Sequence, residues 1–470
     1  MKYISTRGSA PALDFEGVTL AGLASDGGLY VPESWPRFSE GEITAMAGLP
    51  YAELAVRVMA PFTAGSLTEE QLRALCEGAY GRFSHDAVTP LTQFDQQHWL
   101  LELFHGPTLA FKDVALQLLG RLFEHFLEKS DRHLTIVGAT SGDTGSAAID
   151  AVAGRERVDI FMLHPEGRVS DVQRRQMTTV LAPNVHNIAI SGSFDDAQAM
   201  VKAMFVDPAL ASSHGGRFHI GAVNSINWAR LMAQVVYYFA AALQLGAPQR
   251  KVAFSVPTGN FGDVFAGYVA AQMGLPIERL IVATNVNDIL HRALSTGDYS
   301  AGHVTPTAAP SMDIQVSSNF ERLLFCEGGR DGAALAEQMR GFEATKAMQL
   351  TNAQRQGAAA LFTSARVDEA QMAQAMAYAA AHYGEIIDPH TAIGLHAARE
   401  VGVDPAVPVV TLATAHPAKF RDAVERATGA RPALPKRVGD LFEREERYDS
   451  LPGDYAAVRD YVTARATQSA

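Results

Sequence analysis

A lysine that precedes a helix is the first residue of this sequence with evident chemistry. Lys112 lies between Phe111 and Asp113, near the end of the segment His-Gly-Pro-Thr-Leu-Ala-Phe-Lys-Asp at 105–113. Apolar side chains at helical spacing predict an amphipathic helix over residues 114–129. In its first turn, the helix dipole and partial burial would favour a neutral amine, which can form a Schiff base with an aldehyde. Taken alone, the segment is more typical of a surface lysine.

A loop with two glycines follows a predicted strand at 251–256 and precedes a predicted helix at 264–273. Its residues are Thr258, Gly259, Asn260, Phe261 and Gly262. Glycine permits positive φ and close backbone approach, so successive N–H groups can converge on an anion at a helix N-terminus. The loop matches neither the dinucleotide-binding nor the P-loop pattern. A plain tight turn is the alternative.

A second loop, at 139–145, also lies between a predicted strand and a predicted helix. It carries three hydroxyls, a glycine and an acid at Thr140, Ser141, Gly142, Asp143 and Thr144. Hydroxyl and backbone donors at a helix start suit a carboxylate or a phosphate. Helix capping by Ser or Thr explains the same composition equally well, so both interpretations stay open.

A threonine, Thr414, follows a predicted strand at 407–412. A hydroxyl at a strand end could bond an aromatic ring nitrogen, although a structural turn is the commoner explanation. Together the four features supply a lysine for an aldehyde, a loop for a phosphate, a neutral partner for a pyridine nitrogen and donors for a carboxylate. That combination indicates a pyridoxal phosphate site. An unprotonated ring nitrogen favours elimination and replacement over transamination.

The elements that must position these residues follow one pattern. Near-continuous apolar strands at 134–138, 158–163, 251–256, 280–284 and 407–412 alternate with helical stretches. This alternation predicts an α/β fold with parallel sheets that are covered on both faces, whose ligands bind where strands end in loops. The first 90 or so residues lack the pattern and predict a separate N-terminal domain. Prolines and dense charges after residue 435 predict a tail that packs on the core.

The composition restricts the function classes. The chain has 470 residues, enough for two or three structural units, and a formal net charge of −12, which argues against nucleic-acid or anionic-membrane partners. Cys76 and Cys326 lack metal-like spacing, so neither a zinc site nor a disulfide framework is expected. The apolar run 228–247 contains Arg230 and predicts a buried core helix rather than a membrane span. With no secretory signal, a cytoplasmic location is expected.

The motifs, in this order, resemble the threonine synthases, which are fold-type II pyridoxal phosphate enzymes related in fold to the tryptophan synthase β subunit. The matching segments are SDGGLYVPE at 25–33, HGPTLAFKD at 105–113, ATSGDTGSAA at 139–148, VNSINWARLMAQ at 223–234, PTGNFGD at 257–263 and TAHPAKF at 414–420. The resemblance covers nearly the whole chain and favours the long bacterial and fungal branch. It implies an N-terminal domain at 1–90, a catalytic core at 91–435 with a smaller α/β subdomain near 133–225, and a tail at 436–470.

The resemblance also implies an activity: conversion of O-phospho-L-homoserine and water to L-threonine and phosphate. Lys112 would bind the cofactor covalently and carry protons. The other implied cofactor ligands are Phe111, Asp113, Gly259, Asn260, Phe261, Gly262 and Thr414. The implied substrate ligands are Thr140, Ser141, Gly142, Asp143, Thr144, Arg168 and Asn227. No metal and no obligatory protein partner are expected.

Several points stay open at this stage. Related lyases carry an asparagine beside the cofactor O3′, and this chain has Asp143 there, so an acid would face a phenolate. Arg168 and Asn227 are the favoured ligands of the substrate phosphate, with Ser170, Gln173, Ser225, Arg230 and Lys419 as further candidates. The rival activities are another fold-type II lyase, such as a dehydratase, a sulfhydrylase or a phospholyase, and a non-catalytic nucleotide-binding module.

Overall fold

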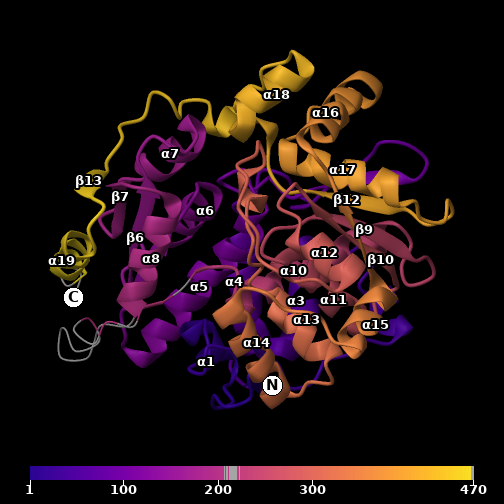
Figure 1. The fold of residues 1–470 in the computed structure, drawn as a ribbon, viewed down its shortest axis with the longest axis horizontal. Helices are drawn as coiled ribbons and strands as arrows, with labels where there is room; N and C mark the ends of the chain where they lie inside the picture. The colour runs from indigo at the N-terminus through magenta and orange to yellow at the C-terminus, as the bar shows by residue number, and fades with distance from the viewer. Residues whose placement is uncertain (206, 208–209, 211–219, 222, 467–470) are drawn as a thin grey trace.

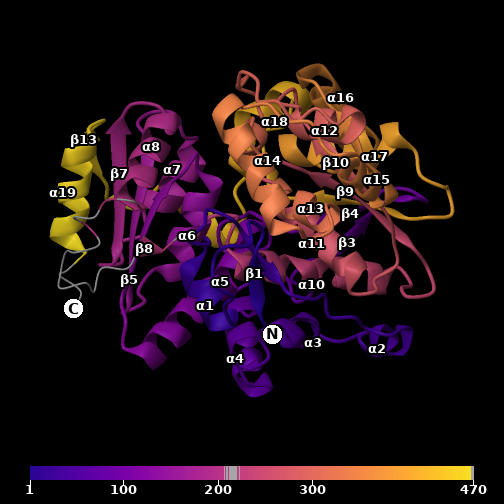
Figure 2. The same cartoon turned by 60° about the horizontal axis from the view of Figure 1, so that its bottom comes forward.

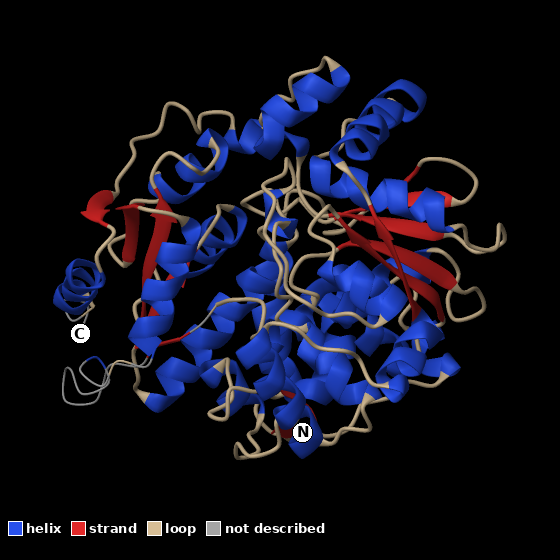
Figure 3. Ribbon diagram, viewed as in Figure 1, coloured by secondary structure: helices blue, strands red, loops and turns tan. Residues whose placement is uncertain are grey.

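Two β-sheets with helices on both faces form the molecule, as the sequence predicts (Figures 1 and 3). The computed structural model describes residues 1–205, 207, 210, 220–221 and 223–466. The larger sheet has the strand order β11-β10-β9-β12-β4-β3, in which only β3 is antiparallel to its neighbour. The smaller sheet has the order β13-β7-β6-β5-β8 and is parallel throughout.

Every predicted strand is present, with ends that differ slightly from the predicted ones. The larger sheet consists of β3 (Leu91–Gln93), β4 (His98–Glu102), β9 (Val252–Pro257), β10 (Ile277–Thr284), β11 (Phe362–Arg366) and β12 (Val409–Ala413). The smaller sheet consists of β5 (Leu134–Ala139), β6 (Val158–Pro165), β7 (Val185–Ser191), β8 (Ile220–Gly221) and β13 (Asp449–Pro452). The carboxyl ends of the parallel strands carry the loops that the sequence singled out.

Alternate side chains of the larger sheet enter two different cores. Val252, Phe254 and Val256 of β9 pack with helices α10 and α11, whereas Ala253 packs with α17. Both faces are thus buried, which explains the near-continuous apolar strands. The helices around this sheet are α10 (Trp228–Gln244), α11 (Gly262–Gln272), α12 (Ile289–Thr296), α13 (Phe320–Glu327), α14 (Gly332–Thr345), α15 (Asn352–Leu361), α16 (Glu369–Tyr383), α17 (Pro389–Val401) and α18 (Arg421–Thr428). The predicted core helix at 228–247 is therefore confirmed.

The smaller sheet is covered in the same way. Ile136 and Ile160 face the core that contains α5 and α6, while Phe161 and Ile188 face α8 and α19. The helices on its two faces are α5 (Lys112–Ser130), α6 (Asp143–Val152), α7 (Asp171–Thr178), α8 (Phe194–Phe205) and α19 (Tyr455–Arg465). Part of the expected subdomain near 133–225 lies outside the described residues.

The N-terminal segment lies beneath both sheets in Figure 2. It contains a short antiparallel pair and four helices: β1 (Tyr3–Ser5), α1 (Phe15–Ala21), β2 (Tyr30–Pro32), α2 (Glu40–Ala45), α3 (Tyr51–Thr63) and α4 (Glu69–Tyr80). The Tyr3 and Phe62 rings lie 5.8 and 5.7 Å from the Trp228 ring of α10. The segment therefore shares one hydrophobic core with α5 and α10.

The C-terminal tail reaches from the larger sheet to the far edge of the smaller one (Figure 1). Arg437 donates to the Gly106 carbonyl at 2.7 Å, and Arg175 of α7 lies 3.1 Å from Glu446. Strand β13 then pairs with β7, and α19 packs on the same sheet. The last four residues lie outside the described part of the chain.

No helix in the described ranges is long and apolar enough to cross a membrane. The same residues contain no group of His, Cys, Asp and Glu side chains that could hold a metal ion. Cys76 and Cys326 are free thiols. The cytoplasmic location stays a prediction from the sequence.

Candidate active site

Helix α5 begins at Lys112 itself, slightly earlier than the apolar spacing predicts. The Phe111 N–H donates to the Thr414 carbonyl at 2.9 Å, which fixes the start of the helix against the end of β12. The Lys112 side chain is buried, and its Nζ lies 4.7 Å from the centre of the Phe111 ring. Burial lowers the pKa of Lys112, an effect that the nearby positive charges of Lys419 and Arg230 reinforce. This environment favours the neutral, nucleophilic amine.

The acid that faces Lys112 is Asp143, whose Oδ2 lies 3.5 Å from the lysine Nζ. Ser311 Oγ donates to the same oxygen at 3.2 Å. The other oxygen, Oδ1, lies 2.9 Å from Lys419 Nζ and accepts from Gln173 Nε2 at 2.8 Å. Burial alone would raise the pKa of Asp143, but the positive charges of Lys419 and Lys112 hold it well below its ordinary value. The carboxylate is therefore ionised, with donors or positive charges beside both oxygens.

Lys419 has two described partners. Besides Asp143, its ammonium donates to the Thr108 carbonyl at 2.8 Å, and its side chain is buried. Gln176 Nε2 donates to the same carbonyl at 2.9 Å. A lysine in this position balances the charge of Asp143, and its role as a candidate ligand of the substrate phosphate stays a prediction.

Asp113 supports the turn before Lys112. Both of its oxygens accept from Thr108, from the backbone N–H at 2.8 Å and the hydroxyl at 2.7 Å. Burial raises the pKa of Asp113 to about 6. Gly106 is required here, because a Cβ at that position would lie 2.3 Å from the Asp113 Cβ. The structure thus gives Asp113 a structural task, and its predicted contact with the cofactor stays a prediction.

The loop from Gly259 to Gly262 joins β9 to α11, as predicted. Its carbonyls are held from one side, since the Gly259 oxygen accepts from Ser317 Oγ at 2.7 Å and the Asn260 oxygen accepts from the Asn319 N–H at 3.0 Å. Phe261 has a left-handed φ of 62°, and α11 begins without a side-chain cap. The first N–H groups of α11 are thus available to an anion. A Cβ at Gly259 would lie 2.6 Å from the Ser311 carbonyl oxygen, which explains that glycine.

The loop from Thr140 to Thr144 has one of the two functions that the sequence left open, the stabilisation of a helix start. Thr140 Oγ1 accepts from the N–H groups of Gly142 and Gly145 at 2.9 Å each, so this hydroxyl stabilises the start of α6. Gly142 has a φ of 135°, a conformation in which other residues are strained. Ser141 and Thr144 are only partly buried. Their hydroxyls remain the candidates for contact with a substrate.

The predicted phosphate ligands lie in two different settings. Asn227 is completely buried: it caps α10 by accepting from the Ala229 N–H at 3.0 Å and donates to the Thr19 carbonyl at 2.9 Å. Arg168 lies exposed in the turn after β6. The neighbouring Ser170 caps α7 by accepting from the Gln173 N–H at 3.3 Å. Neither Asn227 nor Arg168 makes a described contact with Lys112 or Asp143, and their roles stay predictions.

Two buried polar groups near Lys112 were not among the favoured residues. Arg230 donates to the Val223 carbonyl at 2.6 Å, but its Nε has no partner among the described residues and no described carboxylate pairs with it. Burial lowers the pKa of Arg230 to about 10. Asp263, in the first turn of α11, accepts from Tyr237 and Tyr238, while its Oδ2 has no described partner. Burial raises its pKa to about 7.

Sequence reasoning gave no role to Ser311 and His390. Ser311 lies in a short 3-10 turn (Pro310–Met312), for which no periodic pattern exists. His390 follows Asp388 and Pro389 at the start of α17, and this Asp-Pro pair is a recognisable helix start. That signal predicts the helix but not its proximity to Asp143.

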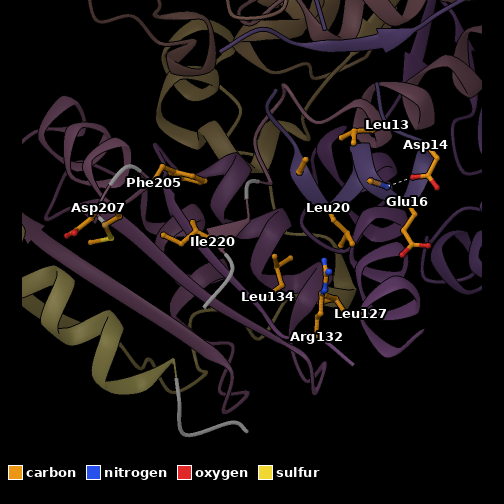
Figure 4. A pocket seen from close by; sticks show the side chains of 13 residues that line it. Leu13, Asp14, Glu16, Leu20, Leu127, Arg132, Leu134, Phe205, Asp207 and Ile220 are labelled. Carbon is orange, nitrogen blue, oxygen red and sulfur yellow. Dashed lines mark hydrogen bonds between the residues drawn. The ribbon is translucent and has the colours of Figure 1, made fainter. Parts of the chain in front are cut away.

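A pocket with a volume of about 640 Å³ lies elsewhere in the described structure. Figure 4 shows its lining, with Leu20 of α1, Leu127 of α5, Arg132 just after α5, and Phe205 of α8. None of the Lys112 neighbours described above lines it. This pocket is therefore separate from the candidate active site.

The residues around Lys112 fit pyridoxal phosphate. A buried amine with a lowered pKa suits an aldehyde, and the uncapped start of α11 suits a phosphate. Arg230 and Asp263 add buried polar atoms that lack described partners. The segments that carry these groups are joined through Ser311, which contacts both Asp143 and Gly259.

Comparison with known proteins identifies the family. Three family models match the chain: threonine synthase N terminus over residues 2–80, pyridoxal-phosphate dependent enzyme over 83–414, and threonine synthase C-terminal over 391–462. A protein of Pseudomonas aeruginosa named threonine synthase is 58% identical over 464 residues, which cover 98% of each chain. This chain belongs to the threonine synthase family. Its enzyme class is that of the pyridoxal phosphate-dependent lyases, and its cofactor is pyridoxal phosphate.

Solved structures of the threonine synthase family have the same fold over the whole chain. A threonine synthase from Brucella melitensis, with pyridoxal phosphate bound, is 50% identical and has a TM-score of 0.96, covering 99% of this chain and 100% of that one. The yeast threonine synthase is 38% identical with a TM-score of 0.93, covering 99% and 98%. The fold-type II class predicted from the sequence is therefore confirmed.

Proposed function

We propose that this chain converts O-phospho-L-homoserine and water into L-threonine and phosphate. The phosphate leaves from Cγ, and water adds at Cβ. The observation that carries the proposal is the buried amine of Lys112, 3.5 Å from an ionised Asp143, in a member of the threonine synthase family. A helix N-terminus for an anion and a buried arginine with no carboxylate partner among the described residues complete the requirements of a phosphorylated amino-acid substrate.

We assign the cofactor contacts to residues of three segments. When bound, pyridoxal phosphate withdraws electrons from the substrate and so eases the loss of protons from Cα and Cβ. Lys112 anchors it and, once released, carries protons between substrate carbons, because its lowered pKa keeps more of the amine in the neutral form that can take up a proton. Gly259, Asn260, Phe261 and Gly262 hold its phosphate, and the Thr414 hydroxyl bonds its ring nitrogen without adding charge.

We assign the substrate carboxylate to the loop at the start of α6. Helix α6 begins at Asp143, and its N-cap, Gly142, has no side chain that could accept a hydrogen bond. The N–H groups in the first turn that Thr140 does not engage, those of Asp143 and Thr144, are therefore the backbone donors for the carboxylate. The hydroxyls of Ser141 and Thr144 add neutral donors. Thr140 and Gly142 contribute by shaping the loop rather than by presenting charge.

We assign the substrate phosphate to Arg230 ahead of Arg168 and Asn227. A buried guanidinium without a carboxylate partner in the described chain is costly unless an anion neutralises it. Arg230 lies close enough to Lys112 to lower the pKa of that amine, whereas Arg168 is exposed and Asn227 has both side-chain polar atoms engaged. The acyl or hydroxyl leaving groups of the rival substrates are uncharged, so they would not neutralise the guanidinium of Arg230.

Product analysis tests the proposed function against its rivals. The purified holoenzyme with O-phospho-L-homoserine should release threonine and phosphate in equal amounts. Phosphate with 2-oxobutanoate and ammonia, but no threonine, would indicate a phospholyase. Faster turnover of threonine or O-acetylserine than of O-phospho-L-homoserine would indicate a dehydratase or a sulfhydrylase, and absence of any turnover would leave only a binding function.

A further inference from the structure

A buried acid fixes one histidine behind the active site. Asp388 is completely buried, and its Oδ2 lies 2.7 Å from His390 Nδ1. The same carboxylate caps α17, since it accepts from the backbone N–H groups of His390 at 2.9 Å and Thr391 at 3.1 Å. A carboxylate that is held by these donors orients the imidazole with its proton on Nδ1. The second ring nitrogen, Nε2, is then an acceptor.

That acceptor is used by Ser311. The backbone N–H of Ser311 donates to His390 Nε2 at 3.3 Å, which only the Nδ1-protonated form of the ring allows. The ring of His390 is buried and lies 4.8 Å from the ring of Phe420, so it has little freedom to turn. His390 therefore holds the short turn at Pro310–Met312 by one backbone bond.

Through the hydroxyl of Ser311, this turn contacts Asp143. Ser311 Oγ donates to Asp143 Oδ2 at 3.2 Å, and this oxygen faces Lys112 at 3.5 Å. The Ser311 carbonyl is packed against Gly259 so closely that a Cβ there would lie 2.6 Å from it. One serine thus links the Asp388–His390 pair to Asp143 and to the glycine loop.

We propose that His390 is a positioning residue, which acts through Ser311 to hold the Asp143 carboxylate in its orientation toward Lys112. The inference rests on the proposed function of Lys112 and Asp143 in the cofactor site. Asp388 sets the tautomer, His390 supplies the acceptor, and Ser311 delivers the hydroxyl. Neither Asp388 nor His390 needs to touch the substrate or the cofactor.

Two substitutions of His390 separate this role from a general structural one. Glutamine can place an oxygen where Nε2 lies and keep the bond from the Ser311 N–H. Asparagine reaches only the position of Nδ1, so it keeps a donor for Asp388 and loses the acceptor for Ser311. We expect His390→Gln to stay within about 3-fold of the native kcat and His390→Asn to lose about 10- to 100-fold, the range of one charge-linked hydrogen bond. The KM should change little in both.

The cofactor gives a readout that does not depend on turnover. In the holoenzyme, the visible absorbance of the Lys112-bound cofactor should shift in His390→Asn and stay native in His390→Gln. Ser311→Ala, which keeps the backbone bond but removes the hydroxyl, should reproduce the shift and the kcat loss. The double variant with His390→Asn and Ser311→Ala should lose no more kcat than either single variant, because both substitutions remove the same link to Asp143. His396→Asn, at a partly exposed histidine on the same helix, is the control.

The outcomes decide the matter. Equal losses in His390→Gln and His390→Asn, additive losses in the double variant, or a native Ser311→Ala would overturn the positioning role. If the wild type forms no threonine while the absorbance shifts follow the expected pattern, then the proposed function fails and the positioning role stands.

Discussion

Lys419 Nζ lies 2.9 Å from Asp143 Oδ1, and both side chains are buried. The sequence raised the question of how an acid could be placed beside an electron-rich phenolate. Lys419 is a counter-ion for this acid, so the two residues together carry no net charge. The contact of Asp143 with the cofactor stays a prediction.

Removal of Lys419 should leave that acid uncompensated. Lys419→Met is expected to destabilise the protein by about 3 kcal/mol, because a buried charge loses its partner. The double variant Lys419→Met with Asp143→Asn should recover much of the loss, since it removes both charges. Urea denaturation of the wild type and of the two variants measures this. A single variant as stable as the wild type would show that Asp143 is neutral in the folded protein.

Lys112→Ala should abolish covalent binding of the cofactor and reduce turnover by several orders of magnitude, because it deletes both the anchor and the proton carrier. The absorbance of the bound cofactor and the rate of threonine formation measure the two effects. Lys129→Ala is the control, because Lys129 lies exposed near the end of the same helix and pairs only with Glu16 in the described structure. Near-native activity of Lys112→Ala would exclude the assigned mechanism.

Arg230 and Arg168 can be distinguished by kinetics. Arg230→Met should raise KM for O-phospho-L-homoserine by about 10- to 100-fold, since charged hydrogen bonds contribute about 1.5–3 kcal/mol each. Slow reactions of substrates without phosphate should change much less. We expect Arg168→Ala to alter KM by less than about 3-fold. The reverse result would restore Arg168, the ligand favoured by the sequence.

The stability of the protein should fall as the pH rises toward neutrality, because of Asp263. Burial raises the pKa of Asp263 from 3.8 to about 7, so between these values the folded state keeps a proton that the unfolded state releases. This contribution to the free energy of unfolding is present at low pH and is lost by about pH 7. At about 1.4 kcal/mol per pKa unit, the loss is up to about 4 kcal/mol.

Asp263→Asn should remove the pH-dependent contribution of Asp263. The difference in unfolding free energy between about pH 5 and about pH 8 should therefore be smaller in this variant than in the wild type. Urea denaturation at the two pH values is the measurement. Asp404→Asn, at an exposed position, is the control. Unchanged pH dependence in Asp263→Asn would show that Asp263 is ionised in the folded state throughout.

Local patterns predicted much of this molecule. The spacing of apolar residues after Lys112 indicated α5, and glycines after apolar strands located the two loops that lead into α6 and α11. The contacts that set the chemistry come from residues distant in sequence: Lys419 and Ser311 reach Asp143 across separations of 276 and 168 residues. Neither has a periodic signal, because each lies in a short irregular turn whose place depends on the packing of both sheets.

The dependence on distant contacts also explains why the sequence favoured Asn227 over Arg230. Both lie in the motif at 223–234, and its amino-acid sequence does not reveal which side chain is buried without a described counter-ion and which caps a helix. Burial and bonding partners depend on the N-terminal segment, since the Asn227 amide donates to the Thr19 carbonyl. Sequence reasoning selected this segment, and only the packed structure separates its members.

Strand β13 has a consequence for synthesis of the chain. It follows the other strands of the smaller sheet at a long distance in the chain, yet it forms the edge of that sheet beside β7. Until residues 449–452 have been synthesised and have folded, the unpaired N–H and C=O groups of β7 remain open to pairing with another chain. Chains that lack β13 should therefore be the forms most prone to aggregate.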